Sequence, residues 1–69
     1  MKNIITKREK EIFQLLIENK STKEISNILN ISEKTVRNHV SNVMQKLDVK
    51  GRAQAIIELI KMDELKIDL

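Results

Sequence analysis

The sequence predicts an all-α domain of four helices that contains a helix-turn-helix motif. The chain has 69 residues, no proline and one glycine, Gly51, which favours long uninterrupted helices over turns and sheets. Polar residues that commonly start helices precede runs of apolar residues at helical spacing. Between residues 21 and 47, two such helices are separated by a very short break, which is the pattern of a helix-turn-helix.

The first helix is expected over residues 7–18. Thr6 and Glu9 have the spacing of a capping box, in which each side chain accepts a hydrogen bond from the backbone N–H of the other residue. The chain should reverse direction at Asn19 or Lys20. The apolar residues that should form the inner face are Ile12, Phe13, Leu15, Leu16 and Ile17.

The second helix is expected over residues 22–29 and the third over residues 33–47. Ser21 begins a second capping box, and Ser32 is a good N-cap for the third helix. Asn30 between the two helices tolerates the left-handed conformation that ends a helix. The apolar residues at helical spacing are Ile25, Ile28, Leu29, Val36, Val40, Val43, Met44 and Leu47.

The fourth helix is expected over residues 52–62, with Gly51 as its N-cap. Its apolar residues cover an arc of roughly 220°, which is wider than a helix packed on one core requires. We expect a two-fold dimer to cover the outer part of this arc. The alternative is that residues 63–69 fold back as a lid, and the size of the apolar patch favours the dimer. The residues expected at the dimer interface are Ile56, Ile57 and Ile60.

Composition argues against an enzyme, a metal site and a membrane span. The chain lacks cysteine, which excludes disulfides and thiolate ligands and favours a cytoplasmic location. The single histidine, His39, has no metal-binding residue three or four positions away, and no two carboxylates suggest an acid–base pair. No apolar run is long enough to cross a bilayer. We therefore expect no catalytic activity, no cofactor, no metal and no membrane association.

Charge patterning favours a polyanionic partner. The formal net charge is +3, and residues 33–57 carry five basic and two acidic side chains. Residues 58–69 carry two basic and four acidic side chains. The positive excess therefore lies on the third helix and the connector after it, whereas the acidic tail would be a poor surface for DNA.

The third helix has a polar face suited to the major groove of DNA. With Val36 and Val40 turned toward the core, the side chains between and after them point outward together. An arginine can donate two hydrogen bonds to a guanine, an asparagine can read an adenine, and a serine allows close approach. The residues expected to read bases are Arg37, Asn38 and Ser41.

Hydroxyl and cationic groups flank this face and are expected to contact phosphates. The N-terminus of the third helix can hold a phosphate through its N–H groups and dipole. The start of the second helix should meet the backbone on the other side of the groove. Other basic residues would position the protein without specifying sequence, and a solvated surface charge is the alternative for any single lysine. The expected phosphate contacts are Thr22, Lys23, Ser32, Lys34, Thr35, His39, Lys46, Lys50 and Arg52.

Separated blocks of the sequence, in the right order, resemble the helix-turn-helix domain of the LuxR family. The stretch Thr6–Ile12 resembles the family's opening "LTxREKEV". A second block resembles "NKEIAxxLxIS" through Lys23, Glu24, Ile25, Leu29, Ile31 and Ser32. A third resembles "TVKxH" through Thr35, Val36, Arg37 and His39. A fourth resembles "KLxVxxRxxA" through Lys46, Leu47, Val49, Gly51, Arg52, Gln54 and Ala55.

The resemblance implies a four-helix domain that contacts bases through its third helix, at Arg37, Asn38 and Ser41, and dimerises through its fourth. In most relatives this domain ends a longer chain, whereas here it is expected to be the whole protein. It therefore also resembles a small stand-alone sporulation regulator of the family. That resemblance implies control of late mother-cell genes, including spore-coat genes, as activator or repressor. RNA polymerase is considered as a further partner, although the sequence itself does not identify it. The alternative function is a helical adaptor that binds a protein through its apolar fourth helix.

Overall fold

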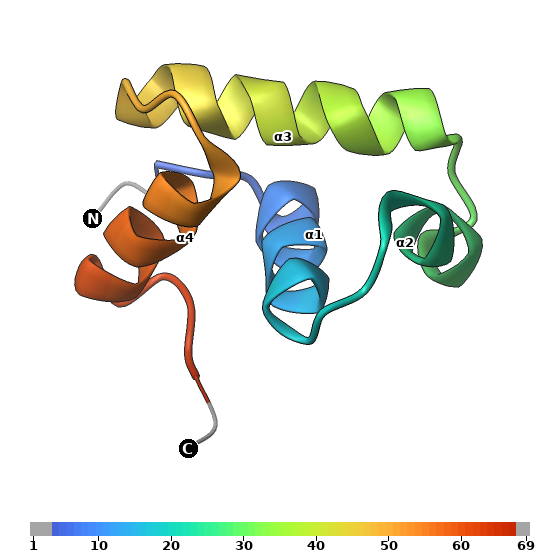
Figure 1. The fold of residues 1–69 in the computed structure, drawn as a ribbon, viewed down its shortest axis with the longest axis horizontal. Coiled ribbons are helices and arrows are strands. Elements are labelled where there is room, and N and C mark those ends of the chain that lie inside the picture. The colour runs from blue at the N-terminus through green and yellow to red at the C-terminus, as the bar shows by residue number, and fades with distance from the viewer. Residues whose placement is uncertain (1–3, 68–69) are drawn as a thin grey trace.

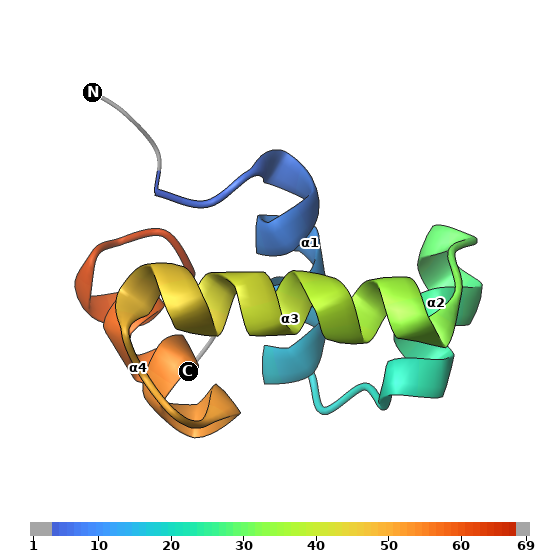
Figure 2. The same cartoon turned by 90° about the horizontal axis from the view of Figure 1, so that it is seen from above.

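The computed structural model describes residues 4–67 and contains four helices in that range, with no strand. The longest helix, α3, lies across the other three, which all pack against its same side (Figures 1 and 2). The expected all-α architecture is confirmed. The helices are α1 (Lys7–Ile17), α2 (Thr22–Leu29), α3 (Glu33–Leu47) and α4 (Arg52–Lys61).

The helix boundaries follow the sequence signals closely. Helices α2 and α3 begin and end where the sequence indicates. Helices α1 and α4 each end one residue earlier than expected, because Glu18 and Met62 leave helical geometry and become the C-caps. A difference of one residue is usual where the last turn of a helix frays.

Both expected capping boxes are present. In the first, the Glu9 N–H donates to Thr6 Oγ1 at 3.1 Å and the Thr6 N–H donates to Glu9 Oε1 at 2.8 Å. Ser21 and Glu24 repeat the arrangement at 3.1 and 2.8 Å. The hydrogen bonds from the Ser21 backbone and hydroxyl hold the pKa of Glu24 below its usual value. These local bonds fix where α1 and α2 begin.

Each of the four helices has an asparagine or aspartate in the left-handed conformation, either as its C-cap (α2 and α3) or directly after its C-cap (α1 and α4). Asn19, Asn30, Asp48 and Asp63 have φ values of 65°, 57°, 55° and 63°. These two residue types tolerate that conformation better than other non-glycine residues do. In each case the next N–H donates to the carbonyl five positions earlier, which is the bond of a Schellman motif. The chain can therefore end four helices while containing a single glycine, Gly51, which serves as the N-cap of α4.

The hydrophobic core lies between α3 and the three helices beneath it. Phe13 is fully buried there, so the only aromatic residue packs in the core. Val36 and Val40 of α3 are 0% and 4% exposed, as the helical pattern predicts. Their burial fixes which side of α3 faces outward. The buried apolar residues are Ile5, Ile12, Phe13, Ile25, Val36, Val40, Val43, Ala55, Leu59 and Leu65.

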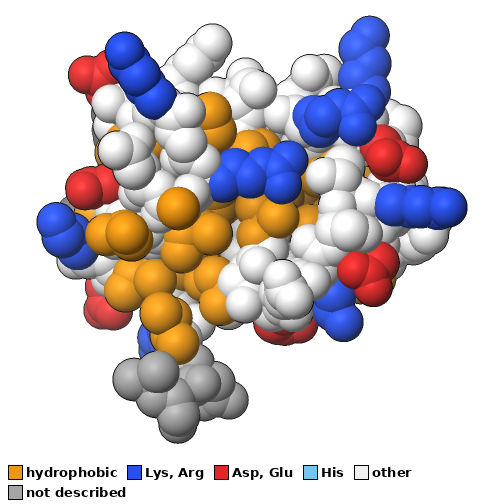
Figure 3. Space-filling view, in the orientation of Figure 1, with side chains coloured by type: hydrophobic (Ala, Val, Ile, Leu, Met, Phe, Trp, Pro, Cys, Tyr) orange, Lys and Arg blue, Asp and Glu red, His pale blue; other side chains and the backbone are white. Residues whose placement is uncertain are grey.

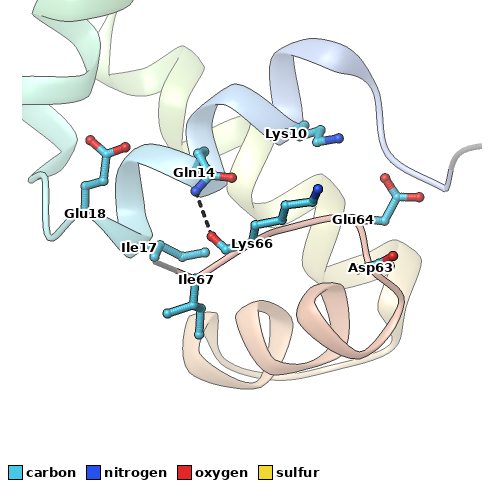
Figure 4. Close-up of a pocket in the computed structure, with 8 residues that line it drawn as sticks. All are labelled: Lys10, Gln14, Ile17, Glu18, Asp63, Glu64, Lys66 and Ile67. Atoms are coloured by element: carbon cyan, nitrogen blue, oxygen red, sulfur yellow. Dashed lines mark hydrogen bonds between the residues drawn. The ribbon is translucent and has the colours of Figure 1, made fainter. Parts of the chain in front are cut away.

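The segment after α4 folds back against α1. Leu65 is 2% exposed, and its N–H donates to the carbonyl oxygen of Leu59 at 3.3 Å. Gln14 Nε2 of α1 donates to the carbonyl oxygen of Lys66 at 3.1 Å, closing one side of a pocket between α1 and this segment (Figure 4). Ile67 remains 47% exposed. Part of the segment 63–69, which the lid alternative expects to fold back, therefore does so. Positions 68–69 of this segment lie outside the described residues.

Candidate nucleic-acid interface

The outer side of α3 carries the residues that the sequence predicts for base reading. Arg37, Asn38 and Ser41 are all exposed, in contrast to the buried Val36 and Val40. The described part of the chain packs against the opposite side of α3, so this face lies open at the edge of the molecule (Figures 1 and 2). With 15 residues the helix is about 22 Å long, and a helix fits the width of the major groove.

Arg37 is held loosely on this face by an acidic residue one turn earlier. Its Nη1 atom lies 3.7 Å from Oε1 of Glu33, and both side chains are about half exposed. The sequence pattern predicts that Arg37 reads a base, and the structure adds Glu33 as its partner on the same helix. The spacing of i and i+4 on one helix would have identified Glu33 as that partner.

The N-terminus of α3 is capped by its own side chains. The Ser32 hydroxyl accepts a hydrogen bond from the Thr35 N–H at 3.0 Å, and the two hydroxyls lie 2.9 Å apart. A phosphate at this end would therefore meet the N–H groups of Glu33 and Lys34 before that of Thr35. Lys34 is exposed beside them and can add a charge-assisted contact.

The start of α2 and the connector before α4 meet in space. Arg52 Nη2 lies 3.5 Å from Thr22 Oγ1, although the two residues are 30 positions apart in the sequence. Lys23, which follows Thr22 in the sequence, and Lys50, two positions before Arg52, are both exposed. The Lys50 backbone N–H donates a hydrogen bond to Gln54 Oε1 at 3.2 Å. The structure thus brings two of the expected phosphate contacts, Thr22 and Arg52, into one cluster at the start of α2.

Lys46 has a different partner from the one expected. Its Nζ lies 2.6 Å from Oε1 of Glu9, whose side chain is 4% exposed. Burial of the Glu9 carboxylate raises its pKa, but hydrogen bonds from Lys46 and Thr6 outweigh this effect and hold the pKa below its usual value. Lys46 therefore anchors α3 to α1, and a phosphate contact from this ammonium would have to share it with a carboxylate.

His39 sits at the edge of the outer face of α3. Its side chain is half-buried, and Nδ1 is enclosed without a hydrogen-bond partner within residues 4–67. Contact with a phosphate would therefore have to come from the other ring nitrogen. In the described part of the chain, no group of three histidine, cysteine, aspartate or glutamate residues could hold a metal ion.

The expected dimer residues differ in accessibility. Ile57 is 53% exposed, whereas Ile56 and Ile60 are partly buried against the core. Met62 and Ile67 are 39% and 47% exposed. Hydrophobic side chains gather over α4 and toward α1, and one Lys or Arg side chain lies across them (Figure 3). The lid thus leaves an apolar surface on α4 uncovered.

A second apolar surface was not foreseen from the sequence. Ile28 belongs to the helical stripe of α2, yet it is 54% exposed and lines a shallow groove between α1 and α2. Ile25 lies in the core and Leu29 packs against it, whereas Ile28 lies on a part of α2 that faces away from the core. The groove also contains Leu15, with Lys7 and Lys10 among its other lining residues.

None of the helices between residues 4 and 67 is long and apolar enough to span a bilayer.

Together, α2, the turn at Asn30 and the outward-facing α3 define a helix-turn-helix domain of the DNA-binding type. Residues 3–59 match the family described as bacterial regulatory proteins, luxR family, and the chain belongs to this family. It is therefore a transcription regulator of the LuxR type with a DNA-binding helix-turn-helix, a class that is not enzymatic.

The relatives include both short and long proteins. The chain is 62% identical over 66 residues to the spore germination protein GerE of Bacillus subtilis (strain 168), covering 96% of this chain and 89% of GerE. A solved structure of the transcription factor GerE superimposes with a TM-score of 0.95 at 60% identity, covering 97% of this chain and 100% of that one. The transcriptional regulatory protein DegU of Brevibacillus brevis is 48% identical over 65 residues, covering 94% of this chain but 28% of DegU.

Proposed function

We propose that this protein binds specific DNA sites as a dimer and inserts α3 into the major groove. The observation that supports this most directly is the exposure of Arg37, Asn38 and Ser41 on a helix whose opposite side is buried through Val36 and Val40. Arg37 would donate to a guanine and Asn38 to an adenine or a bridging water. Ser41 would let the helix approach the base edges closely.

Contacts to the DNA backbone would come from both sides of the groove. On one side are Lys34 and the N–H groups that begin α3, and on the other are Lys23 and the Thr22–Arg52 pair. Lys50 would extend this second group. These contacts would set the position of α3 on the duplex, while the side chains on its outer face would select the sequence.

Dimerisation would use the apolar surface of α4 centred on Ile57. A two-fold axis there would present two copies of α3 in related orientations, so the preferred site would be palindromic or nearly so. The centres of the two half-sites would be separated by about one or more helical turns of DNA, each about 34 Å. A dimer would also double the number of phosphate contacts.

The similarity to GerE supports a role in sporulation. We propose that the targets are late mother-cell genes, including spore-coat genes, and that the protein acts in the cytoplasm on the nucleoid. RNA polymerase is the partner through which such a regulator would act at promoters. This part of the proposal depends on the relationship with GerE, whereas the mode of DNA contact depends on the geometry of α3.

Selection of bound duplexes from a random pool tests the function directly. We expect enrichment of a near-palindromic site, with an affinity that falls steeply and linearly on a log–log plot as salt increases. The competing possibility, a protein-binding adaptor, predicts no enriched site and no systematic salt dependence. That result would contradict DNA recognition by α3.

A further inference from the structure

We infer that Glu33 is a positioning residue that holds the Arg37 guanidinium in the orientation needed to read a guanine. The inference deepens the proposed function and rests on Arg37 being a base-reading residue. It begins from a contact on the outer face of α3, where Glu33 Oε1 lies 3.7 Å from Arg37 Nη1.

The acidic residue at the start of α3 is placed differently from those of α1 and α2. Glu9 and Glu24 are each the third residue of their helix, where they accept the N-cap backbone N–H. In α3 that position is Thr35, and the acidic residue, Glu33, is the first residue. Its carboxylate therefore points along the helix to the side chain four positions later rather than back to the cap.

The ion pair with Glu33 uses Nη1 of Arg37 and leaves its Nε and Nη2 donors available to bind a guanine. A guanidinium presents Nε–H and one Nη2–H side by side on one edge, and two parallel donors of this kind match O6 and N7 of guanine. Because Glu33 engages Nη1, a guanine could approach the Nε–Nη2 edge without displacing the carboxylate. Both side chains are about half exposed, so the duplex can reach them.

Holding Arg37 in this way would reduce the number of conformations that it can adopt at the DNA. A long arginine side chain loses rotamer freedom when it binds, and a residue that already restricts it lowers that cost. A free arginine could also swing to a phosphate, which carries no sequence information. Glu33 would thus increase the preference for guanine over other bases at one position.

The test measures discrimination rather than affinity. The probes are the duplex selected from the random pool and the same duplex with the guanine read by Arg37 replaced. The readout is the ratio of the two affinities. For Glu33→Ala we expect this ratio to fall about two- to fivefold, the size expected for loss of one exposed ion pair. A ratio equal to that of the unaltered protein would overturn the inference.

Two companion variants separate this effect from the loss of a charge. Glu11→Ala removes the same charge from α1, where Glu11 makes a comparable exposed pair with Arg8 at 3.3 Å, and it should leave the ratio unchanged. In an Arg37→Ala background, Glu33→Ala should also leave the ratio unchanged. A reduced ratio in either case would mean that Glu33 acts through general electrostatics, against the inference.

The same set distinguishes failure of the inference from failure of the proposed function. If Arg37→Ala relaxes discrimination and Glu33→Ala does not, Arg37 reads a base without help from Glu33. If Arg37→Ala itself leaves discrimination intact at every base pair, base reading by this residue is wrong, and the inference falls with it.

Discussion

Glu9 Oε1 accepts a hydrogen bond from Lys46 Nζ at 2.6 Å and so joins the first turn of α1 to the last turn of α3. The same carboxylate oxygen also accepts the Thr6 N–H at the start of α1. One buried side chain therefore caps the start of α1 and links it to α3 where the two helices cross. Because α3 carries the residues that we propose read bases, this contact belongs to the scaffold that would position them.

Removing the cation from this pair should weaken the fold. Lys46→Met keeps most of the aliphatic stem but leaves the Glu9 carboxylate buried without its charged partner. We expect the free energy of unfolding at pH 7 to fall by about 1–3 kcal/mol, measured by urea denaturation. Lys61→Met is the matched control, because the exposed Lys61 pairs with a partly exposed Glu58 at 3.8 Å and its loss should change stability little. Equal effects of the two variants would contradict the anchoring role of Lys46.

The stability of the protein should depend on pH through the same carboxylate. The pKa of Glu9 is lower in the folded than in the unfolded state, so its contribution is fully present above the unfolded value. That contribution is lost as the pH falls from about 5 through the lowered folded pKa. Glu24, whose pKa is also lowered by its capping bonds, acts in the same direction.

Glu9→Gln isolates the contribution of Glu9 to this dependence. Glutamine can still complete the capping box but cannot titrate. We expect the variant to be less stable at pH 7, with a difference from the parent that shrinks between about pH 5 and pH 3. Unfolding curves collected across this range measure the difference. A gap that stays constant would show that Glu9 does not titrate with folding.

Dimerisation should depend on the exposed residue of α4. Ile57→Asp places a carboxylate in the apolar surface without disturbing the core, whereas Ile60 is partly buried and a charge there could unfold the domain. We expect Ile57→Asp to sediment as a monomer at concentrations where the parent is a dimer. Ile28→Asp is the matched control, since Ile28 is 54% exposed on α2, and it should leave the mass unchanged. A dimeric Ile57→Asp would place the interface elsewhere.

Phosphate contacts should affect all DNA sequences alike. Lys34→Gln removes an exposed charge beside the start of α3, and we expect weaker binding to every duplex with a salt slope smaller by about one. Lys61→Gln, which removes the same charge from α4, should leave DNA binding close to that of the parent. Fluorescence anisotropy at several salt concentrations measures both. A loss confined to one sequence would mean that Lys34 contacts a base.

The parts of the fold that could be predicted are those encoded by nearby residues. The starts of α1 and α2 follow from the capping boxes, and the end of α2 follows from Asn30. The inward turn of Val36 and Val40 follows from helical spacing, and this alone was enough to orient the outer face of α3.

The features that the sequence did not reveal depend on residues far apart in the chain. The Glu9–Lys46 pair spans 37 positions, and nothing in the local pattern of either helix indicates it. The exposure of Ile28 and the burial of Leu65 depend likewise on how the elements pack. The local pattern therefore predicts a phosphate contact for Lys46, whereas the structure pairs it with the Glu9 carboxylate.

The most direct test of base reading by α3 is the affinity of Arg37→Ala for the selected site and for each single-base variant of it. We predict a loss of about 1–3 kcal/mol on the selected site and a relaxed preference at one base pair in each half-site. Arg8→Ala, which removes a partly exposed arginine from α1, should leave the base preferences unchanged. Arg37→Ala binding with every base preference intact would contradict the assignment of α3 as the reading helix.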